Sequence, residues 1–230
     1  MSLLAQVMTM LGGSGLPDQL PDEPFHLLNA WFTDACNAKS ILNPNAMVLA
    51  TATKDGRPSA RVVLCKDIRP AERAVVFYTN YESRKGREMA ANPHVSVVFH
   101  FETAGQQARV EGVVSRLEGP ECDTYFASRA PLSKIGAWAS MQSQPIASRA
   151  DFAQRIIDAM QRLGLSPLKV LAANLGATEV NIARPPHWGG FKLVATRVEL
   201  WTNSQGRLHD RAEWVFQNDT NRWIATRLQP

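Results

Sequence analysis

Residues 46–66 read AMVLATATKDGRPSARVVLCK, and their pattern indicates β structure. Residues 46–53 form an apolar, β-prone run, and residues 59–66 form a second run of the same length. The segment between them contains Asp55-Gly56, a strong signal for a tight hairpin turn. The stretch therefore predicts two antiparallel strands joined by a hairpin.

More β-prone runs lie along the chain on both sides of a helical block. They cover residues 74–79, 94–101, 107–117, 190–201, 207–217 and 222–228. Hairpins and meanders in this number are typical of an antiparallel barrel or sandwich. The last three runs have few partners among themselves, so we expect them to join the first sheet. The sequence thus predicts a mainly β protein with helices, of the α+β class, as a single domain over residues 24–230.

Helical periodicity marks the remaining segments. A helix is predicted from residue 24 with Asp22 as its cap, and shorter helices are predicted over residues 83–91, 120–128 and 133–140. Residues 149–163 predict an amphipathic helix whose apolar face holds Phe152, Ile156, Ile157, Met160 and Leu163. Residues 1–23 show no sustained period and predict a flexible tail. Residues 164–187 show no clear pattern and are a candidate insertion.

The composition limits the class of protein. The 230 residues are 45% hydrophobic and 20% charged, as in ordinary globular proteins, and no apolar run is long enough to span a membrane. The net charge of +4 is dispersed, which argues against a nucleic-acid arm and fits one or two phosphate-bearing small ligands. The cysteines and histidines lack metal-ligand spacing, and Cys36, Cys65 and Cys122 suggest no disulfide framework. We therefore expect a cytoplasmic protein without a metal.

Residues 207–211 read Arg-Leu-His-Asp-Arg and follow a β-prone run and a turn at residues 203–206. Side chains alternate between faces on a strand, so Arg207, His209 and Arg211 are predicted to share one face. Such groups repel one another unless an anion lies between them. An anion site and an edge strand whose charges face water are both open at this point.

Two other stretches could bind phosphate. Ser83 can cap a helix whose first turn continues Arg-Lys, and a helix start with free amides and cations attracts anions. Tyr125 and Arg129 lie four apart on a predicted helix, so they share a face, and Ser133 could lie near the same point. Each stretch taken alone could instead be an ordinary helix surface.

The predicted strand over residues 59–66 carries two cations, Arg61 and Lys66. Strict alternation puts them on opposite faces, so both can reach one ligand only if the strand ends or bends at one of them. Strand-end charges that reach water are the commoner alternative. No catalytic triad, paired catalytic carboxylates or nucleotide-binding glycine motif stands out. An enzyme built on these residues would therefore draw its reactivity from a bound cofactor.

Taken together, these stretches resemble the pyridoxamine 5′-phosphate oxidase family over about residues 24–230. The ordered set of motifs is specific, although each motif alone is weak. The matching segments are Arg61-Val-Val-Leu-Cys-Lys66, Phe77-Tyr-Thr-Asn80, Ser83-Arg-Lys85, Gln107 in QARVEG, Tyr125-Phe-x-Ser-Arg129, Ser133-x-Ile-Gly-Ala-Trp138, Gln142-Ser143, Trp188-Gly-Gly190, Trp201, Arg207-Leu-His-Asp-Arg211 and Arg227-Leu-Gln-Pro230. The resemblance implies a Greek-key, antiparallel split β-barrel that binds FMN, and a homodimer with FMN at the subunit interface.

The resemblance also implies residue roles and a reaction. The residues implied to bind FMN are Arg61, Val62, Val63, Leu64, Cys65, Lys66, Tyr78, Thr79, Arg84, Lys85, Gln107, Gln142, Ser143, Trp201 and Arg211. Those implied to bind substrate are Lys66, Tyr125, Arg129, Ser133, Arg207 and His209, of which Arg207 and His209 are the catalytic pair. The implied reaction moves a hydride from C4′ of pyridoxamine or pyridoxine 5′-phosphate to FMN. O2 then reoxidises the flavin, and the products are pyridoxal 5′-phosphate, H2O2 and, from the amine, ammonia.

Some positions depart from the family pattern. Gln106 stands where the family often has arginine, and residues 128–131 read SRAP where it usually has SRPR. Asp210, on the opposite face from the cationic residues, is expected to be a structural partner. The alternatives are a phenazine-pathway flavin oxidase of the same fold and a non-catalytic flavin- or pyridoxal-phosphate-binding protein. The intact substrate set argues against the phenazine type.

Overall fold

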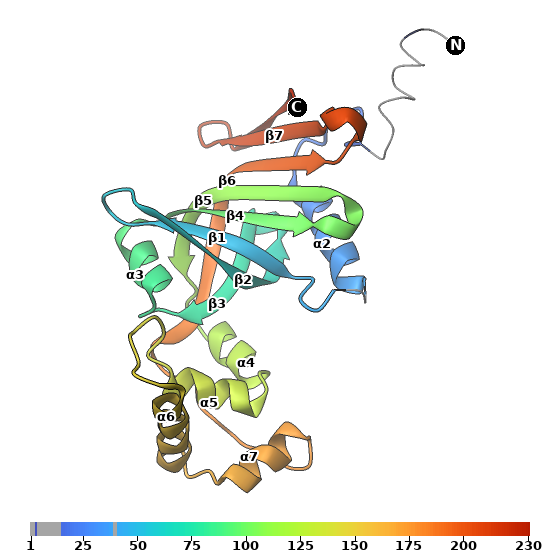
Figure 1. Ribbon diagram of the computed structural model, residues 1–230. Helices are drawn as coiled ribbons and strands as arrows, with labels where there is room; N and C mark the ends of the chain where they lie inside the picture. Colours follow the sequence, from blue (N-terminus) through green and yellow to red (C-terminus); the bar gives the residue numbers. More distant parts are fainter. Residues whose placement is uncertain (1–2, 4–14, 39–40) are drawn as a thin grey trace. The chain divides into compact units, whose positions relative to one another are not determined.

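The computed structural model describes residues 3, 15–38 and 41–230, which divide into two compact units (Figure 1). The barrel unit comprises the described residues up to Phe77 together with Asn92–Val114 and Lys192–Pro230. The helical unit comprises Tyr78–Ala91 and Ser115–Phe191. Predictions that concern the other residues of the tail, or residues 39–40, lie outside the described part of the chain. Among the described helices, none has the length and apolar character needed to cross a membrane.

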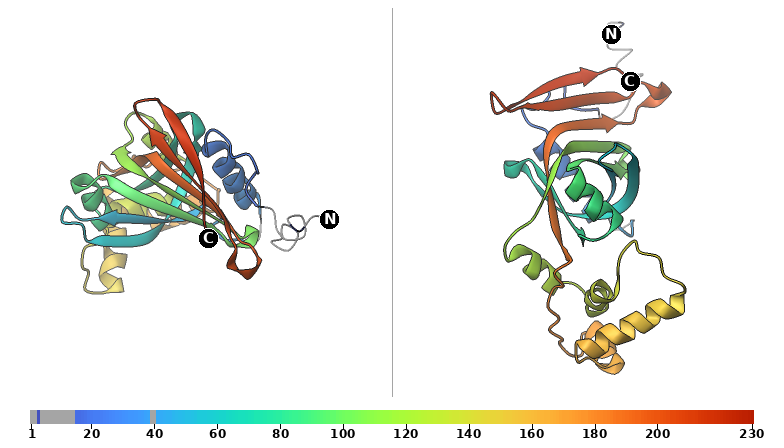
Figure 2. Two further views of the ribbon diagram at one scale, coloured as in Figure 1. Left: turned by 90° about the horizontal axis from the view of Figure 1, so that it is seen from above. Right: turned by 90° about the vertical axis from the view of Figure 1, so that its left-hand side faces the viewer.

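The strands of the described chain form one sheet that closes on itself. They are β1 (Ala46–Ala52), β2 (Pro58–Arg69), β3 (Ala74–Asn80), β4 (His94–Phe101), β5 (Gln106–Arg116), β6 (Trp188–Thr202), β7 (Asp210–Gln217) and β8 (Arg222–Leu228). Their order is β3-β2-β1-β4-β5-β6-β7-β8, and β3 also pairs with β6, so the first six close into a barrel (Figure 2). β4 returns antiparallel to β1 beside the β1-β2-β3 meander, which is a Greek key. The predicted antiparallel barrel is confirmed.

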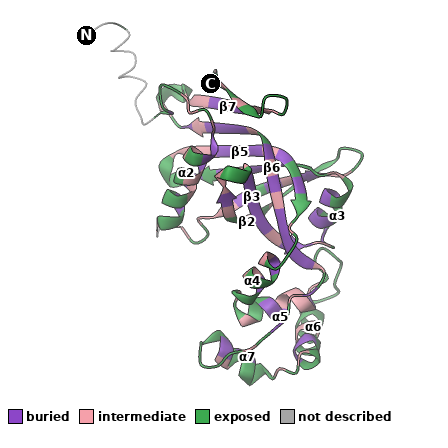
Figure 3. Ribbon diagram, turned by 180° about the vertical axis from the view of Figure 1, so that it is seen from behind, coloured by how far each residue is buried: buried purple, intermediate pink, exposed green. Residues whose placement is uncertain are grey.

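The hairpin over residues 46–66 forms as its Asp-Gly signal predicts. β1 and β2 pair antiparallel along their length, and Gly56 in the turn has a φ of +85°, which glycine adopts without steric cost. Side chains alternate along β1, so Met47 and Leu49 enter the core while Val48 faces outward. Burial alternates in the same way along β4 and β5, whereas β3 is buried along almost its whole length (Figure 3).

Helix α2 (Phe25–Asn37) packs its apolar stripe into the barrel unit and begins with a different cap from the predicted one. The prediction of Asp22 is wrong, because the Glu23 carboxylate accepts the backbone N–H groups of Phe25 (2.8 Å) and His26 (3.0 Å). These amides belong to the first turn and have no partner within the helix. The residues that α2 buries are Phe25, Leu28, Trp31 and Ala35.

Residues 15–23, part of the predicted flexible tail, are tied to the barrel unit. Leu16 is buried, and its N–H donates to the carboxylate of Asp210 at 2.8 Å. Arg227 pairs with the same carboxylate and donates to the carbonyl of Pro17 at 2.6 Å. Local periodicity could not predict this, because the contacts join residues at opposite ends of the chain. The expectation that Asp210 is a structural partner agrees with its contacts.

The helical unit holds α3 (Arg84–Ala91), α4 (Glu121–Ala127), α5 (Pro131–Ala139), α6 (Arg149–Arg162) and α7 (Pro167–Asn174). The helix predicted over residues 149–163 is confirmed, but part of its predicted apolar face is wrong. Phe152 and Ile157 are exposed, and the buried positions are Ala159 and Met160. The core of this unit consists of Phe126, Ile135, Ala139, Ala159, Met160, Val170, Ile182 and Trp188.

Candidate active site

A buried lysine links three segments that the resemblance assigns to FMN. Lys85 Nζ donates to Gln142 Oε1 (2.9 Å), Thr79 Oγ1 (3.1 Å) and Ser83 Oγ (3.4 Å). Lys85 is only 9% exposed, and a buried cation is costly unless hydrogen bonds satisfy it. Thr79 lies near the end of β3, Lys85 in the first turn of α3 and Gln142 beyond α5. Three separate segments of the helical unit therefore share one polar network.

The start of α3 has the geometry that the sequence predicts. Ser83 Oγ accepts the backbone N–H of Gly86 (3.2 Å) and donates to the carbonyl of Asn80 (2.7 Å). A Cβ at Gly86 would collide with the backbone of Tyr81, so glycine is required for this close approach. The cap and the glycine together fix the direction in which Lys85 leaves the helix.

Two neighbouring residues that the resemblance assigns to FMN behave differently from Lys85. Arg84 is largely exposed and pairs with Glu88 one turn later, at 2.8 Å. Ser143 follows Gln142 and has a φ of +71°, a left-handed conformation that is uncommon outside glycine. The structure therefore brings Lys85, and not Arg84, into the network.

Tyr78, Tyr125 and Trp188 stack in the helical unit, and Arg129 lies over the Trp188 ring. The ring centroids of Tyr78 and Tyr125 are 3.9 Å apart, and those of Tyr78 and Trp188 are 5.6 Å apart. The guanidinium carbon of Arg129 is 4.5 Å from the Trp188 centroid, a cation–π contact. The cluster thus joins Tyr78, assigned to FMN, with Tyr125 and Arg129, assigned to substrate. Ser133 lies on α5 with an exposed side chain.

Arg129 has the chemistry of an anion site. Its Nη1 is buried and has no hydrogen-bond partner within the described part of the chain. Burial lowers the pKa of this guanidinium from its ordinary value, and Tyr125 opposes that effect. A buried donor without a partner costs about 1–3 kcal/mol. An anionic oxygen bound at Nη1 would remove this cost and stabilise the charged form.

The turn between β6 and β7 differs from the predicted continuous strand. Residues 205–207 form a 3₁₀ turn, Arg207 has a φ of +63°, and β7 begins only at Asp210. The prediction that Arg207, His209 and Arg211 alternate on one strand is therefore wrong. Gly206 is also left-handed (φ +64°), and the two residues turn the chain before the strand starts. The β6–β7 hairpin itself is confirmed.

His209 and Arg211 flank Trp201 on this hairpin. The rings of His209 and Trp201 have centroids 4.6 Å apart, and the N–H of Ser204 donates to His209 Nδ1 at 3.3 Å. Trp201 and Arg211 are directly opposite each other in the β6–β7 pairing. Three of the predicted site residues therefore gather at this end of the barrel unit.

The run Arg61-Val62-Val63-Leu64-Cys65-Lys66 lies on β2, and the pairing of this strand with β3 is irregular at Lys66. The strand neither ends nor stops pairing at Lys66. Cys65 pairs with Phe77 and Asp67 with Val76, so the register shifts and Lys66 occupies a bulge. A bulge changes the face to which the following residues point. Arg61 donates to Thr51 Oγ1 and Ser59 Oγ, each at 2.5 Å. On the neighbouring pair of strands, Gln107 of β5 lies opposite His100 of β4.

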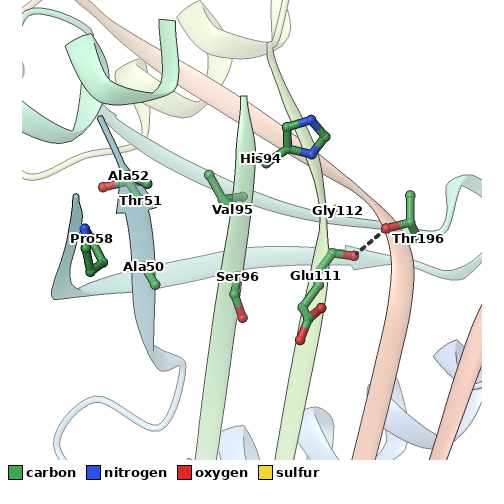
Figure 4. Close-up of a pocket in the computed structure, with 10 residues that line it drawn as sticks. All are labelled: Ala50, Thr51, Ala52, Pro58, His94, Val95, Ser96, Glu111, Gly112 and Thr196. Atoms are coloured by element: carbon green, nitrogen blue, oxygen red, sulfur yellow. Dashed lines mark hydrogen bonds between the residues drawn. The ribbon is translucent and has the colours of Figure 1, made fainter. Parts of the chain in front are cut away.

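A groove of about 350 Å³ lies elsewhere on the barrel unit (Figure 4). Thr196 donates across one side of it to the carbonyl of Glu111 at 3.4 Å. None of the predicted site residues lines this groove, so it is not the candidate site. Its lining residues are Ala50, Thr51, Ala52, Pro58, His94, Val95, Ser96, Glu111, Gly112 and Thr196.

Known families and relatives match most of the chain. Residues 32–161 match the family model pyridoxamine 5′-phosphate oxidase, and residues 188–230 match pyridoxine 5′-phosphate oxidase C-terminal dimerisation region. The pyridoxine/pyridoxamine 5′-phosphate oxidase of Gluconobacter oxydans (strain 621H) is 45% identical, over 92% of this chain and 96% of its own. That of Myxococcus xanthus (strain DK1622) is 42% identical, over 92% and 93%. This chain belongs to the pyridoxine/pyridoxamine 5′-phosphate oxidase family.

Solved structures agree on the fold of this oxidase family member. PhzG from Burkholderia lata 383, crystallised with tetrahydrophenazine-1-carboxylic acid, matches with a TM-score of 0.78 at 32% identity, over 93% of this chain and 95% of that one. A pyridoxamine 5′-phosphate oxidase-related, FMN binding protein from Nostoc punctiforme PCC 73102 matches with a TM-score of 0.66 at 15% identity, over 93% and 100%. The predicted split-barrel fold is confirmed.

Sequence reasoning did not assign site roles to two residues of this oxidase family member. Trp188 belongs to a Trp-Gly-Gly motif, but its contact with Arg129 depends on the fold. Glu199 stands between Val198 and Leu200 and is buried like both of them. Alternation would place it in solvent, so nothing in the local pattern indicates a buried carboxylate.

Proposed function

We propose that this protein oxidises pyridoxine 5′-phosphate and pyridoxamine 5′-phosphate with O2 to pyridoxal 5′-phosphate, using FMN as its cofactor. H2O2 is the second product, and the amine also yields ammonia. One observation carries the proposal. Arg129 is half-buried beside Tyr125, and its buried Nη1 has no hydrogen-bond partner among the described residues, in a chain 42–45% identical to pyridoxine/pyridoxamine 5′-phosphate oxidases.

The donor set of this chain fits FMN. Lys85 offers a buried cation, and Thr79 and Gln142 offer a hydroxyl and an amide in the same network. Arg61 and Arg211 add guanidinium groups from the barrel unit, with Trp201 opposite Arg211. When bound, FMN supplies the hydride acceptor and the reactivity toward O2. The task of these residues is to hold the cofactor in one orientation.

The substrate residues have separate tasks in this proposal. Tyr125, Arg129 and Ser133, with Lys66, bind the substrate phosphate by charge-assisted hydrogen bonds. Arg207 and His209 orient the substrate ring through position and electrostatics. No protein nucleophile is required, which is consistent with the state of the Cys65 thiol. Its burial raises its pKa to about 12, so it stays protonated.

The proposal includes a homodimer with FMN at the subunit interface. The match of residues 188–230 to a dimerisation region supports it. Val62, Val48 and Val98 are cross-strand neighbours on β2, β1 and β4, and the first two are exposed. A row of outward-facing valines is a surface that a second copy would cover. A cytoplasmic location is also part of the proposal, and the free thiols of Cys36, Cys65 and Cys122 are compatible with it.

The test is to purify the protein, record its flavin spectrum, and follow pyridoxal 5′-phosphate and H2O2 from each substrate in air. We expect a yellow protein that oxidises both substrates. Each reaction should form pyridoxal 5′-phosphate and H2O2 in equal amounts. A colourless protein that cannot take up FMN would overturn the proposal. A yellow protein without turnover would limit it to flavin binding.

A second candidate is oxidation of a phenazine precursor, because the fold of PhzG matches this chain at a TM-score of 0.78. The same assay with tetrahydrophenazine-1-carboxylic acid separates the two. Turnover that depends on the substrate phosphate favours the vitamin B6 reaction, since the phenazine compound has no phosphate for Arg129 to bind.

A further inference from the structure

Glu199 is a buried carboxylate that contacts two arginines from neighbouring strands. It lies on β6 with 5% of its surface exposed. Its Oε1 accepts from Arg211 Nη2 (2.8 Å) and Nε (3.0 Å), and its Oε2 accepts from Arg109 Nη2 (2.5 Å). Arg109 lies on β5 and Arg211 on β7. One carboxylate therefore ties three adjacent strands together.

The contact with Arg211 fixes a direction as well as a position. Two nitrogens of a planar guanidinium on one carboxylate oxygen hold the plane of that group, which a single contact would not. Arg211 Nη1 is held from the other side by the carbonyl of Gln229 at 3.1 Å. Arg211 thus has little freedom to turn.

We propose that Glu199 is a positioning residue for the cofactor site, acting through Arg211 without touching the cofactor. The inference rests on the proposed function, in which Arg211 binds FMN. A long side chain loses conformational entropy when it binds a ligand, and this loss is smaller when the side chain is already held in place. Glu199 therefore strengthens FMN binding although its own charge has the same sign as the phosphate of FMN.

The negative charge of Glu199 makes it possible to distinguish a positioning role from a direct electrostatic effect on FMN. Arg109 also pairs with Glu111 (3.0 Å), and Arg197 pairs with Glu213 (2.6 Å) and lies 3.7 Å from Glu111. With Glu199 and Arg211, these residues form a network of three cations and three carboxylates. Removing any one carboxylate leaves the network more positive, which would by itself attract FMN. The positioning role predicts the opposite result for Glu199 alone.

Glu213 provides a matched control. It is the cross-strand partner of Glu199 on β7 and belongs to the same network, but its carboxylate pairs with Arg197 and not with Arg211. Glu213→Gln removes the same charge from the same face of the sheet. It leaves both contacts between Glu199 and Arg211 in place.

The experiment is a titration of flavin-free protein with FMN, followed by flavin fluorescence, for the wild type and each variant. We expect Glu199→Gln to weaken FMN binding about tenfold, as the loss of a charge-assisted contact implies. Glu213→Gln should stay within about twofold of the wild type, because its pair with Arg197 is partly exposed and does not hold Arg211. Glu199→Asp keeps the charge but withdraws the carboxylate, and should also weaken binding. Melting temperatures of the flavin-free proteins show that each variant is folded.

A double variant tests whether Glu199 acts through Arg211. Once Arg211 is replaced by alanine, adding Glu199→Gln should weaken FMN binding no further, because the two residues act as a unit. Equal affinity of Glu199→Gln and Glu213→Gln would overturn the inference, and so would independent, multiplying effects in the double variant. If the wild type itself does not bind FMN, the proposed function fails first, so the two failures are distinct.

Discussion

Three residues assigned to the cofactor or substrate occupy irregular backbone. Lys66 lies in a β-bulge, Ser143 has a φ of +71° and Arg207 has a φ of +63°. A left-handed conformation costs a residue with a Cβ about 1–2 kcal/mol. Such costs persist where the surrounding structure holds the residue, and they are common at functional sites. Arg73 and Asn221 are left-handed as well and have no assigned role, so the irregular backbone is compatible with the assigned roles but does not select these residues by itself.

At Arg207, the effect of the side chain on turnover can be separated from the effect of the left-handed backbone on stability. Arg207→Ala and Arg207→Gly should both lose most of the turnover and keep FMN, because both remove the guanidinium assigned to substrate. The glycine variant should be more stable than the alanine variant, with a free energy of unfolding about 1 kcal/mol higher, since glycine adopts this φ without strain. Steady-state kinetics, flavin content and denaturant titration measure the three quantities.

The comparison variant for this prediction is Arg84→Ala. The resemblance assigns Arg84 to FMN, so this variant should lose flavin affinity and not the response to substrate. If Arg207→Ala and Arg84→Ala lost flavin equally, the division of roles would be wrong. Arg84 already pairs with Glu88. If Arg84→Ala kept its affinity for FMN, Lys85 would be the main cation of that segment.

Arg129→Ala should raise KM for pyridoxine 5′-phosphate by roughly tenfold to a hundredfold, because a charge-assisted contact to the phosphate is lost. FMN affinity should not change. Arg149→Ala, at an exposed arginine of α6, is the control and should behave like the wild type. An unchanged KM in Arg129→Ala would contradict the assignment of the unpartnered nitrogen to the phosphate.

The sequence did not predict the local geometry of several of these residues. Arg207, His209 and Arg211 were expected to alternate on a strand, but a left-handed arginine follows Gly206 and delays the strand to Asp210. Propensity cannot indicate this, because left-handed backbone favours glycine and asparagine and not arginine. The bulge at Lys66 could not be predicted from the sequence either, since it depends on how β2 pairs with β3.

At the scale of elements, alternation and turn signals predicted the barrel well. The strands begin and end within a few residues of the predicted limits, because their apolar faces are buried on one side and the period is strong. Residues 164–187 gave no pattern, yet they contain α7, and Val170 and Ile182 are buried in the core of the helical unit. Part of that unit's stability therefore lies in a segment between the two family-model matches.

Ile182 and Leu171 test how this segment contributes. Ile182→Ala should lower the free energy of unfolding by about 2–5 kcal/mol, because Ile182 is buried and its removal leaves a cavity. Leu171→Ala, at an exposed position of α7, should change it by less than about 0.5 kcal/mol. Thermal or denaturant unfolding measures both. Equal small effects would show that the segment is a loosely attached insertion.

At the scale of the whole molecule, the proposed dimer joins the outward face of the barrel to cofactor binding. The row Val62–Val48–Val98 leads across the strands to Arg109, which pairs with Glu199. The apolar row and the charged network are therefore adjacent on one sheet. A second copy that covers the row would also exclude water near the network, which strengthens its ion pairs.

Val48→Asp places a charge in this row and should shift the protein from twice the 25.4 kDa chain mass to the single chain mass. FMN affinity should fall with it and recover at high protein concentration, because a cofactor that binds at the interface pulls the subunits together. Leu168→Asp, at the exposed face of α7, is the control and should remain dimeric. Light scattering and FMN titration at several protein concentrations measure both effects. A Val48→Asp monomer that binds FMN as tightly as the wild type, at every concentration, would show that the cofactor site lies within one subunit.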